Sequence, residues 1–314
     1  MAQSEFDTAV EEARQRNRTG NRAWRIGGAV AGAIFFGIFG AVGSVAGGAW
    51  IVAVAIVFGA LVGLGIASLV VRSRNRRAAH LSVAANWAAR NGWDYRETTD
   101  IPAIDLGFLE QGDRRYAEDG ASGTIAGHQA EILNFTVEED RRDADGDRTT
   151  DRYPFFLIVI HRAWQGPHVA MTRRSISFGR GWRNALRSSV TGEQAVEMEN
   201  DAFEKRFQVL LPDDWGKDVA FLLIAPDMQE QMADGRMLAD VLQVDATPAF
   251  MFLAWKGHFS AEDIPELEER IAGAAVLAER WRDDIPVSMR PLSAPGTPPP
   301  PPPMPPAPPE PTSS

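Results

Sequence analysis

Two long runs without a charged residue stand near the start of the chain, at residues 26–46 and 49–71. As α-helices they would be about 31 and 34 Å long, which suffices to cross a hydrocarbon core of about 30 Å. Neither run has a polar face, which disfavours a buried helical hairpin in a soluble core. The pattern therefore predicts two transmembrane helices, 26–46 and 49–71, joined by a tight turn at Gly47 and Gly48.

Arginines flank this pair of runs on both sides, whereas the connecting turn carries no charge. They are Arg14, Arg16, Arg18, Arg22 and Arg25 before the first run, and Arg72, Arg74, Arg76 and Arg77 after the second. Basic residues stay on the cytoplasmic side of bacterial membranes. We therefore expect a two-pass protein of the inner cell membrane with both termini, including the segment 1–25, in the cytoplasm.

Small residues recur every four positions along each apolar run. The stripes are Ala29, Ala33, Gly37 and Ala41 in the first run, and Ala55, Gly59, Gly63 and Ala67 in the second. Such stripes let helix backbones approach closely in a membrane. They predict helix packing either within one hairpin or between copies of the chain, so a homo-oligomer is an open alternative.

Residues 78–290 predict one cytosolic α+β domain. We expect a helix at 78–91 that ends at Gly92, a glycine-rich loop around 112–127, and helices at 215–232, interrupted near Pro226, and at 261–284. Strands are expected at 133–137, 155–160, 168–172, 207–211, 238–244 and 249–255. Strand 133–137 alternates and should be half-buried, whereas the apolar strand 155–160 should be covered on both faces and have 168–172 as its neighbour. Elements grouped in this way favour α+β over a doubly wound α/β fold.

The charge is unevenly distributed along the chain. Residues 1–77 carry a formal charge of +5, while the rest of the chain carries −15. An acidic domain repels phosphate backbones, so nucleic acid is not an expected partner. The chain has no Cys, which excludes disulfides and thiolate metal sites.

The last segment, residues 291–314, differs in composition from the domain before it. It holds 13 of the chain's 21 Pro, six of them consecutive at 298–303. Such a sequence is typical of a disordered, polyproline-rich tail. It serves either as a solubilising spacer or as a docking site for a protein that binds Pro-rich segments.

Motifs of known chemistry are missing from the sequence. There is no HExxH pair, and no nucleophile elbow, P-loop or dinucleotide fingerprint stands in a suitable setting. His161 and His168 flank an expected turn, but a third metal ligand is not evident. We therefore assign no catalytic, cofactor-binding or metal-binding residue, and favour a protein that is not an enzyme.

One basic patch stands out in the acidic domain. It contains Arg173, Arg174, Arg180, Trp182, Arg183 and Arg187, with no acidic residue between Arg173 and Arg187. Arginine near a membrane surface is attracted to anionic lipid headgroups, and Trp suits the interface. The patch is either a membrane-surface contact or a solvated loop.

Four segments follow one another between residues 90 and 235: NGWDY (91–95), HRAWQGPHVAMTRRS (161–175), ENDAFEKRFQV (199–209) and LLIAPDMQEQM (222–232). Together they resemble a bacterial family of two-span membrane-anchored proteins of unknown function. The resemblance implies an anchored cytosolic domain and supplies no catalytic residues. The Pro-rich tail is not part of it.

These observations favour a membrane-anchored, non-catalytic binding or regulatory module of unknown ligand. Its expected partner is the lipid bilayer, with anionic headgroups and a protein that binds the tail as further candidates. A membrane-tethered hydrolase with a site assembled from scattered residues, or a component of an oligomeric channel, are the alternatives.

Overall fold

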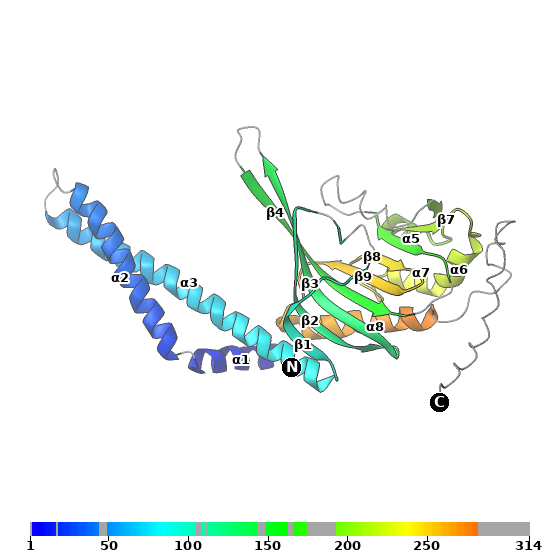
Figure 1. The fold of residues 1–314 in the computed structure, drawn as a ribbon, viewed down its shortest axis with the longest axis horizontal. Coiled ribbons are helices and arrows are strands. Elements are labelled where there is room, and N and C mark those ends of the chain that lie inside the picture. Colours follow the sequence, from blue (N-terminus) through cyan, green and yellow to red (C-terminus); the bar gives the residue numbers. More distant parts are fainter. Residues whose placement is uncertain are drawn as a thin grey trace, which may run out of the picture.

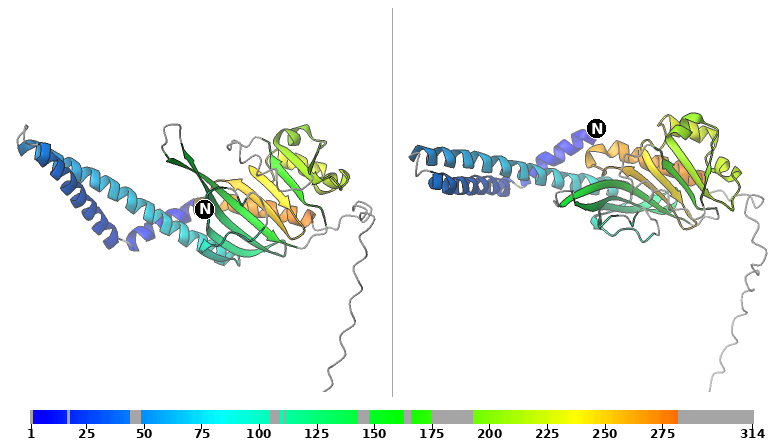
Figure 2. Two further views of the ribbon diagram at one scale, coloured as in Figure 1. Left: turned by 45° about the horizontal axis from the view of Figure 1, so that its top comes forward. Right: turned by 90° about the horizontal axis from the view of Figure 1, so that it is seen from above.

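The computed structural model describes residues 2–16, 18–43, 49–104, 109–110, 112–142, 148–162, 166–174 and 193–281. It contains three N-terminal helices and an α+β domain built on one large sheet (Figure 1). The helices are α1 (Ala2–Arg16), α2 (Arg18–Gly43) and α3 (Ala49–Arg90). Two further views show that α2 and the first half of α3 project away from the domain (Figure 2). The Pro-rich segment 291–314 lies outside the described residues.

The long helix α3 joins the projecting part to the domain without a break. We expected two elements, a span at 49–71 and a domain helix at 78–91, but the structure has one helix through both. The basic stretch between them, Arg72–Arg77, contains no Gly or Pro, and Arg is a good helix former. The helix ends as expected before Gly92, whose φ of +73° suits glycine, and the Trp93 amide returns to the Ala88 carbonyl at 2.7 Å.

Helix α2 packs antiparallel on α3 through glycines. A methyl group on Gly28 would collide with Ala67 and with the carbonyl of Gly63, and one on Gly32 would collide with the carbonyl of Gly59. Of the small residues singled out in the sequence, Gly59, Gly63 and Ala67 thus lie against α2, and Gly37 lies against Ile56. On α2 the closest approach uses Gly28 and Gly32, one position before the stripe that starts at Ala29.

Within the described residues, one helix is long and apolar enough to cross a membrane by length and composition. It runs from Ala53 to Arg90, and only 17% of its most apolar window is buried. This helix contains most of the second span expected from the sequence. The first expected span, 26–46, falls on α2 as far as Gly43, and residues 44–48 lie outside the described residues.

The sheet of the described domain has nine strands, and all neighbouring pairs are antiparallel. Its order is β1-β2-β3-β4-β9-β8-β5-β7-β6. The strands are β1 (Asp94–Thr99), β2 (Arg114–Ile125), β3 (His128–Arg142), β4 (Arg148–His161), β5 (Val169–Arg173), β6 (Glu193–Val196), β7 (Phe207–Pro212), β8 (Val241–Ala246) and β9 (Phe250–Lys256). The α+β class expected from the sequence is confirmed.

Several expectations about single strands need correction. The stretch expected as a glycine-rich loop is β2, because Gly120 lies against the Thr99 side chain and Gly123 lies against the Trp93 indole, where a larger residue would not fit. The strand at 133–137 is buried on both faces rather than half-buried. Strand β5 neighbours β7 and β8, whereas β4, which contains 155–160, pairs with β3 and β9.

Helices cover one face of the sheet and form the larger core. They are α5 (Asp201–Arg206), α6 (Asp218–Leu223), α7 (Pro226–Ala233), the short η1 (Ala261–Asp263) and α8 (Ile264–Arg280), together with the second half of α3. Pro226 opens α7, as the sequence indicated. Ala84, Trp87 and Ala88 of α3 belong to this core, so the helix that leaves the domain is also part of its interior.

Replacing Gly63 by Leu tests the close approach of α2 and α3. We expect Gly63→Leu to weaken the packed pair by about 2 kcal/mol, because the added side chain meets the Gly28 carbonyl. The measurement is the yield of cross-linking between Asn21→Cys and Asn75→Cys by a short bismaleimide. These two positions are chosen because their native side chains form a 3.2 Å hydrogen bond between α2 and α3. Gly65→Leu is the matched control, because nothing lies within 4 Å of that position. Equal cross-linking in both leucine variants would contradict the packing.

Candidate functional site

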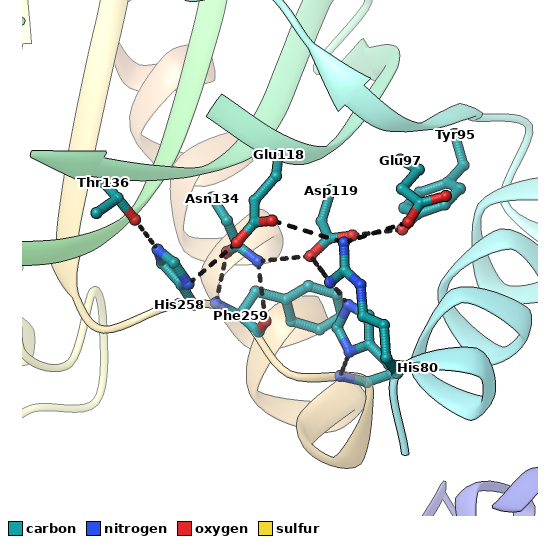
Figure 3. Close-up of polar contacts among 11 residues, drawn as sticks. His80, Tyr95, Glu97, Glu118, Asp119, Asn134, Thr136, His258 and Phe259 are labelled. Atoms are coloured by element: carbon teal, nitrogen blue, oxygen red, sulfur yellow. Dashed lines mark hydrogen bonds and ion pairs between the residues drawn. The ribbon is translucent and has the colours of Figure 1, made fainter. Parts of the chain in front are cut away.

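A polar cluster lies where α3 crosses the β1–β2 edge of the sheet (Figure 3). At its centre is Asp119 of β2, whose φ of +52° is a left-handed conformation that Asp tolerates better than most residues. The register of β2 against β3 shifts between Glu118 and Ala121. Neighbouring side chains of a regular strand point to opposite faces, but at this irregularity Glu118 and Asp119 lie on the same side, where both approach Arg77.

Donors from three elements surround the Asp119 carboxylate. From α3, Arg77 Nη1 lies 2.7 Å and His80 Nε2 lies 3.3 Å from Oδ2. The Tyr95 hydroxyl of β1 donates to Oδ1 at 2.6 Å, and Asn134 Nδ2 of β3 lies 3.3 Å from Oδ2. The Asp119 side chain is only 2% exposed, so these contacts replace its hydration.

The charge states of the cluster follow from this geometry. Burial alone would raise the pKa of Asp119, but its contacts, above all with His80 and Tyr95, outweigh burial and hold the pKa well below its ordinary value. Burial, and then the hydrogen bond to the carboxylate, raise the pKa of Tyr95. Burial lowers the pKa of Arg77, but Asp119 reverses this and leaves it raised. At neutral pH the cluster is therefore an anion held by a cation and a neutral phenol.

His80 and Asn134 extend the cluster to the turn between β9 and α8. The Ala261 amide donates to His80 Nδ1 at 3.0 Å, so we assign the imidazole proton to Nε2, which faces Asp119. Asn134 holds Phe259 by two hydrogen bonds, accepting from its amide at 2.7 Å and donating to its carbonyl at 3.1 Å. We call Arg77, His80, Tyr95, Asp119 and Asn134 the Asp119 cluster.

A second histidine lies beside the cluster in an arrangement that superficially resembles a catalytic triad. Thr136 Oγ1 is 2.8 Å from His258 Nε2, and Glu118 Oε1 is 3.8 Å from His258 Nδ1. The second distance is too long for a hydrogen bond. Thr136 is only 3% exposed, so its hydroxyl is shielded from a substrate. Burial lowers the pKa of His258, which keeps its ring neutral at pH 7. The pair therefore lacks access to a substrate, and His258 lacks the hydrogen-bonded acid that would orient it as a base.

The Asp119 cluster is better suited to hold α3 against the sheet than to carry out a reaction. The Asp119 carboxylate is surrounded by donors of the protein itself, and Arg77 also lies 3.6 Å from Glu118 and 3.8 Å from Glu97. No group of three or more His, Asp or Glu side chains within the described ranges is placed to hold a metal ion. Chemically, the cluster fixes α3 and the β9–α8 turn to β1, β2 and β3.

The two histidines considered from sequence have separate partners. His161 Nε2 lies 3.1 Å from Glu131, and His168 Nε2 lies 3.1 Å from Asp245. Asp245 is fully buried and also accepts a hydrogen bond from Gln243. Each histidine therefore neighbours one carboxylate, on strands β3 and β8 respectively.

The basic patch chosen from sequence lies mostly outside the described residues. The residues outside the described part of the chain are Arg180, Trp182, Arg183 and Arg187. Arg173 pairs with Asp240 at 2.8 Å, and Arg174 donates to the carbonyl of Phe207 at 3.1 Å. These two arginines are thus engaged inside the domain, and their contact with lipid stays a prediction.

The Asp119 cluster itself was missed by sequence reasoning. Its members come from α3, β1, β2 and β3, and no short motif connects them. In the sequence, Arg77 stands out only as one of the arginines that flank a span. A weak signal was the Asp119–Gly120 pair, which is typical of an irregular backbone position.

Comparisons with known proteins give little guidance. No family model matches the chain, and no curated protein matches it, so the resemblance to a two-span family stays a prediction. A solved structure, that of the mycobacterial trehalose monomycolate transport factor A (TtfA), is similar with a TM-score of 0.43 and 12% identity. The match covers 65% of this chain and 97% of that one. This likeness is too low to transfer any property.

Asp119→Asn tests the cluster. Asn keeps the tolerance for a left-handed backbone but removes the charge, which leaves Arg77 without its buried partner. Because the Arg77 side chain is 38% exposed and keeps Glu118 at 3.6 Å, the loss in the free energy of unfolding should be about 2 kcal/mol, less than for a fully buried pair. The control is Glu97→Gln, whose partner atoms are 3.8 Å apart at an exposed site and whose effect should stay within about 0.5 kcal/mol. Both are measured by urea unfolding of the full chain in detergent micelles.

The pH dependence gives a second readout of the same variant. The folded pKa of Asp119 lies below its unfolded value of about 4, so the carboxylate stabilises the protein above that pH. This stability is lost as the pH falls toward the folded pKa. Asp119→Asn should therefore flatten the acid side of the stability profile. An unchanged acid slope, or equal losses in both variants, would show that Asp119 does not organise the cluster.

Proposed function

We propose that the protein is a membrane-anchored, non-catalytic binding or regulatory module. In this proposal α2 and α3 cross the inner membrane as a two-span hairpin, and both termini and the α+β domain lie in the cytoplasm. The carrying observation is that one continuous helix, α3, exposes apolar side chains in its first half and packs one face into the domain core in its second.

The exposed apolar surface supports insertion into lipid. Leu61 and Leu69 of α3 are 63% and 68% exposed, and Ile34 and Ile38 of α2 are 59% and 61% exposed. Removing a large apolar side chain from water is favourable by about 1.5–3 kcal/mol. A surface patch of this size on two adjacent helices is therefore a membrane or protein contact.

The polar residues of this region support the direction of insertion. Arg22 and Arg25 precede the apolar part of α2, and Arg72 and Arg74 follow that of α3. The Arg74 guanidinium lies over the ring of Trp24, 5.7 Å from its centroid. Trp and Arg at one level are typical of the membrane interface, and arginines favour its cytoplasmic side.

The non-catalytic part of the proposal rests on the Asp119 cluster. Arg77 and Tyr95 both bind the Asp119 carboxylate, which fixes α3 and β1 rigidly to β2 and is a structural role. No ionisable residue lies within the apolar runs 26–46 and 49–71, which disfavours ion transport. The Pro-rich tail, 291–314, remains the candidate docking site for a protein partner.

Single-cysteine labelling tests the topology, since the chain has no native Cys. We expect Gly47→Cys to react with a membrane-impermeant maleimide in intact spheroplasts. Ser4→Cys and Ser314→Cys should react only after lysis, because both termini are cytoplasmic.

The three positions separate the alternatives. Labelling of Ser4→Cys together with Gly47→Cys before lysis would mean that α3 alone crosses the membrane. Recovery of the unlabelled chain in the detergent-free soluble fraction would contradict membrane anchoring altogether.

A further inference from the structure

Helices α1, α2 and α3 enclose a polar groove at the cytoplasmic end of the apolar surface. The groove has a volume of about 940 Å³ and is lined mainly by Arg14 and Gln15 of α1, Asn21, Arg22 and Arg25 of α2, and Asn75 of α3. We call it the basic groove. Each of the three helices contributes side chains, so the site exists only because α1 folds back along α3.

The charge of the basic groove is positive and largely uncompensated. Glu11, which also lines it, pairs with Arg14 of its own helix at 3.1 Å. No acidic side chain within the described residues pairs with Arg22 or Arg25. With three arginines and one glutamate, the groove has a formal charge of +2.

The Asn21–Asn75 contact fixes the floor of the groove. Asn21 Nδ2 donates to Asn75 Oδ1 at 3.2 Å, which ties the start of α2 to α3. Asn75 is only 5% exposed, although it lies on the outward-projecting helix. This half-buried amide pair keeps the site polar directly beside the apolar surface.

The level of the groove is that of lipid headgroups. Ile26 follows Arg25 directly and is 55% exposed, and Val70, one residue before the groove residue Val71, is 36% exposed. Apolar side chains that face hydrocarbon thus begin within one residue of the groove on both α2 and α3. An anion that reaches this level from the membrane is a headgroup phosphate.

We propose that the basic groove binds the headgroup phosphate of one anionic phospholipid. The inference rests on the proposed function, since it requires α2 and α3 to stand in the bilayer. Guanidinium groups bind phosphate oxygens in bidentate fashion, and basic pockets between membrane helices on the cytoplasmic side suit anionic headgroups. The lipid then bridges α1 to the spans and orients the domain on the membrane.

The test uses the full chain in nanodiscs of phosphatidylcholine with a minority of phosphatidylglycerol. Native mass spectrometry after release counts the lipids that stay bound. We expect one retained phosphatidylglycerol per chain, and Arg22→Gln/Arg25→Gln should weaken its retention by about thirtyfold, the combined effect of two arginines near the surface. Arg72→Gln/Arg76→Gln is the matched control, because it removes the same charge from exposed positions outside the groove.

Each other outcome has a distinct meaning. Equal losses in both double variants would overturn the groove and leave only a diffuse attraction of basic residues to the membrane. Displacement of the lipid by inorganic phosphate in the buffer would assign the groove to a soluble anion instead. Failure of the unmodified chain to enter nanodiscs would overturn the proposed function itself, whereas entry without preference for phosphatidylglycerol would overturn only the lipid site.

Discussion

One unbroken series of helix hydrogen bonds from Ala49 to Arg90 couples the two halves of this protein. A helix of 42 residues is about 63 Å long, and it has no Gly or Pro between Arg72 and Arg90 at which to bend. Its first half cannot expose so much apolar surface to water without cost, and its second half cannot leave the domain without opening the core around Trp87. The position of the apolar surface therefore dictates where the sheet lies.

The Asp119 cluster determines the orientation of α3 relative to the sheet. Burial of Ala84, Trp87 and Ala88 attracts α3 to the domain core, but apolar contacts are non-directional and leave rotation about the helix axis weakly defined. An ion pair whose carboxylate is buried adds little net stability, yet it is costly to break, so it selects one arrangement. Arg77 meets Asp119 in one rotation of α3 only, and the same carboxylate holds Tyr95 of the edge strand.

Part of the fold could be predicted from the sequence, whereas strand β2 and the Asp119 cluster could not, for physical reasons. Apolar runs and Pro226 predicted helices correctly, and the six-residue run 155–160 predicted a strand buried on both faces. Strand β2 was missed because its glycines indicate a loop, although Gly123 is needed to admit the Trp93 indole. The arginines at 72–77 predict the end of a span, but charge marks a membrane boundary without ending a helix, so α3 continues through them. The cluster around Asp119 depends on long-range strand register, which no local pattern encodes.

The continuity of α3 can be measured directly by pulsed electron spin resonance on the full chain in nanodiscs. Spin labels at Ile66→Cys and Asn86→Cys occupy exposed positions in the two halves of the helix, and the absence of native Cys makes the labelling specific. Twenty residues of unbroken helix separate the two sites by about 30 Å, so the account expects one narrow distance distribution centred near that value. A broad or markedly shorter distribution would show a joint between the apolar half and the domain, and would contradict the account.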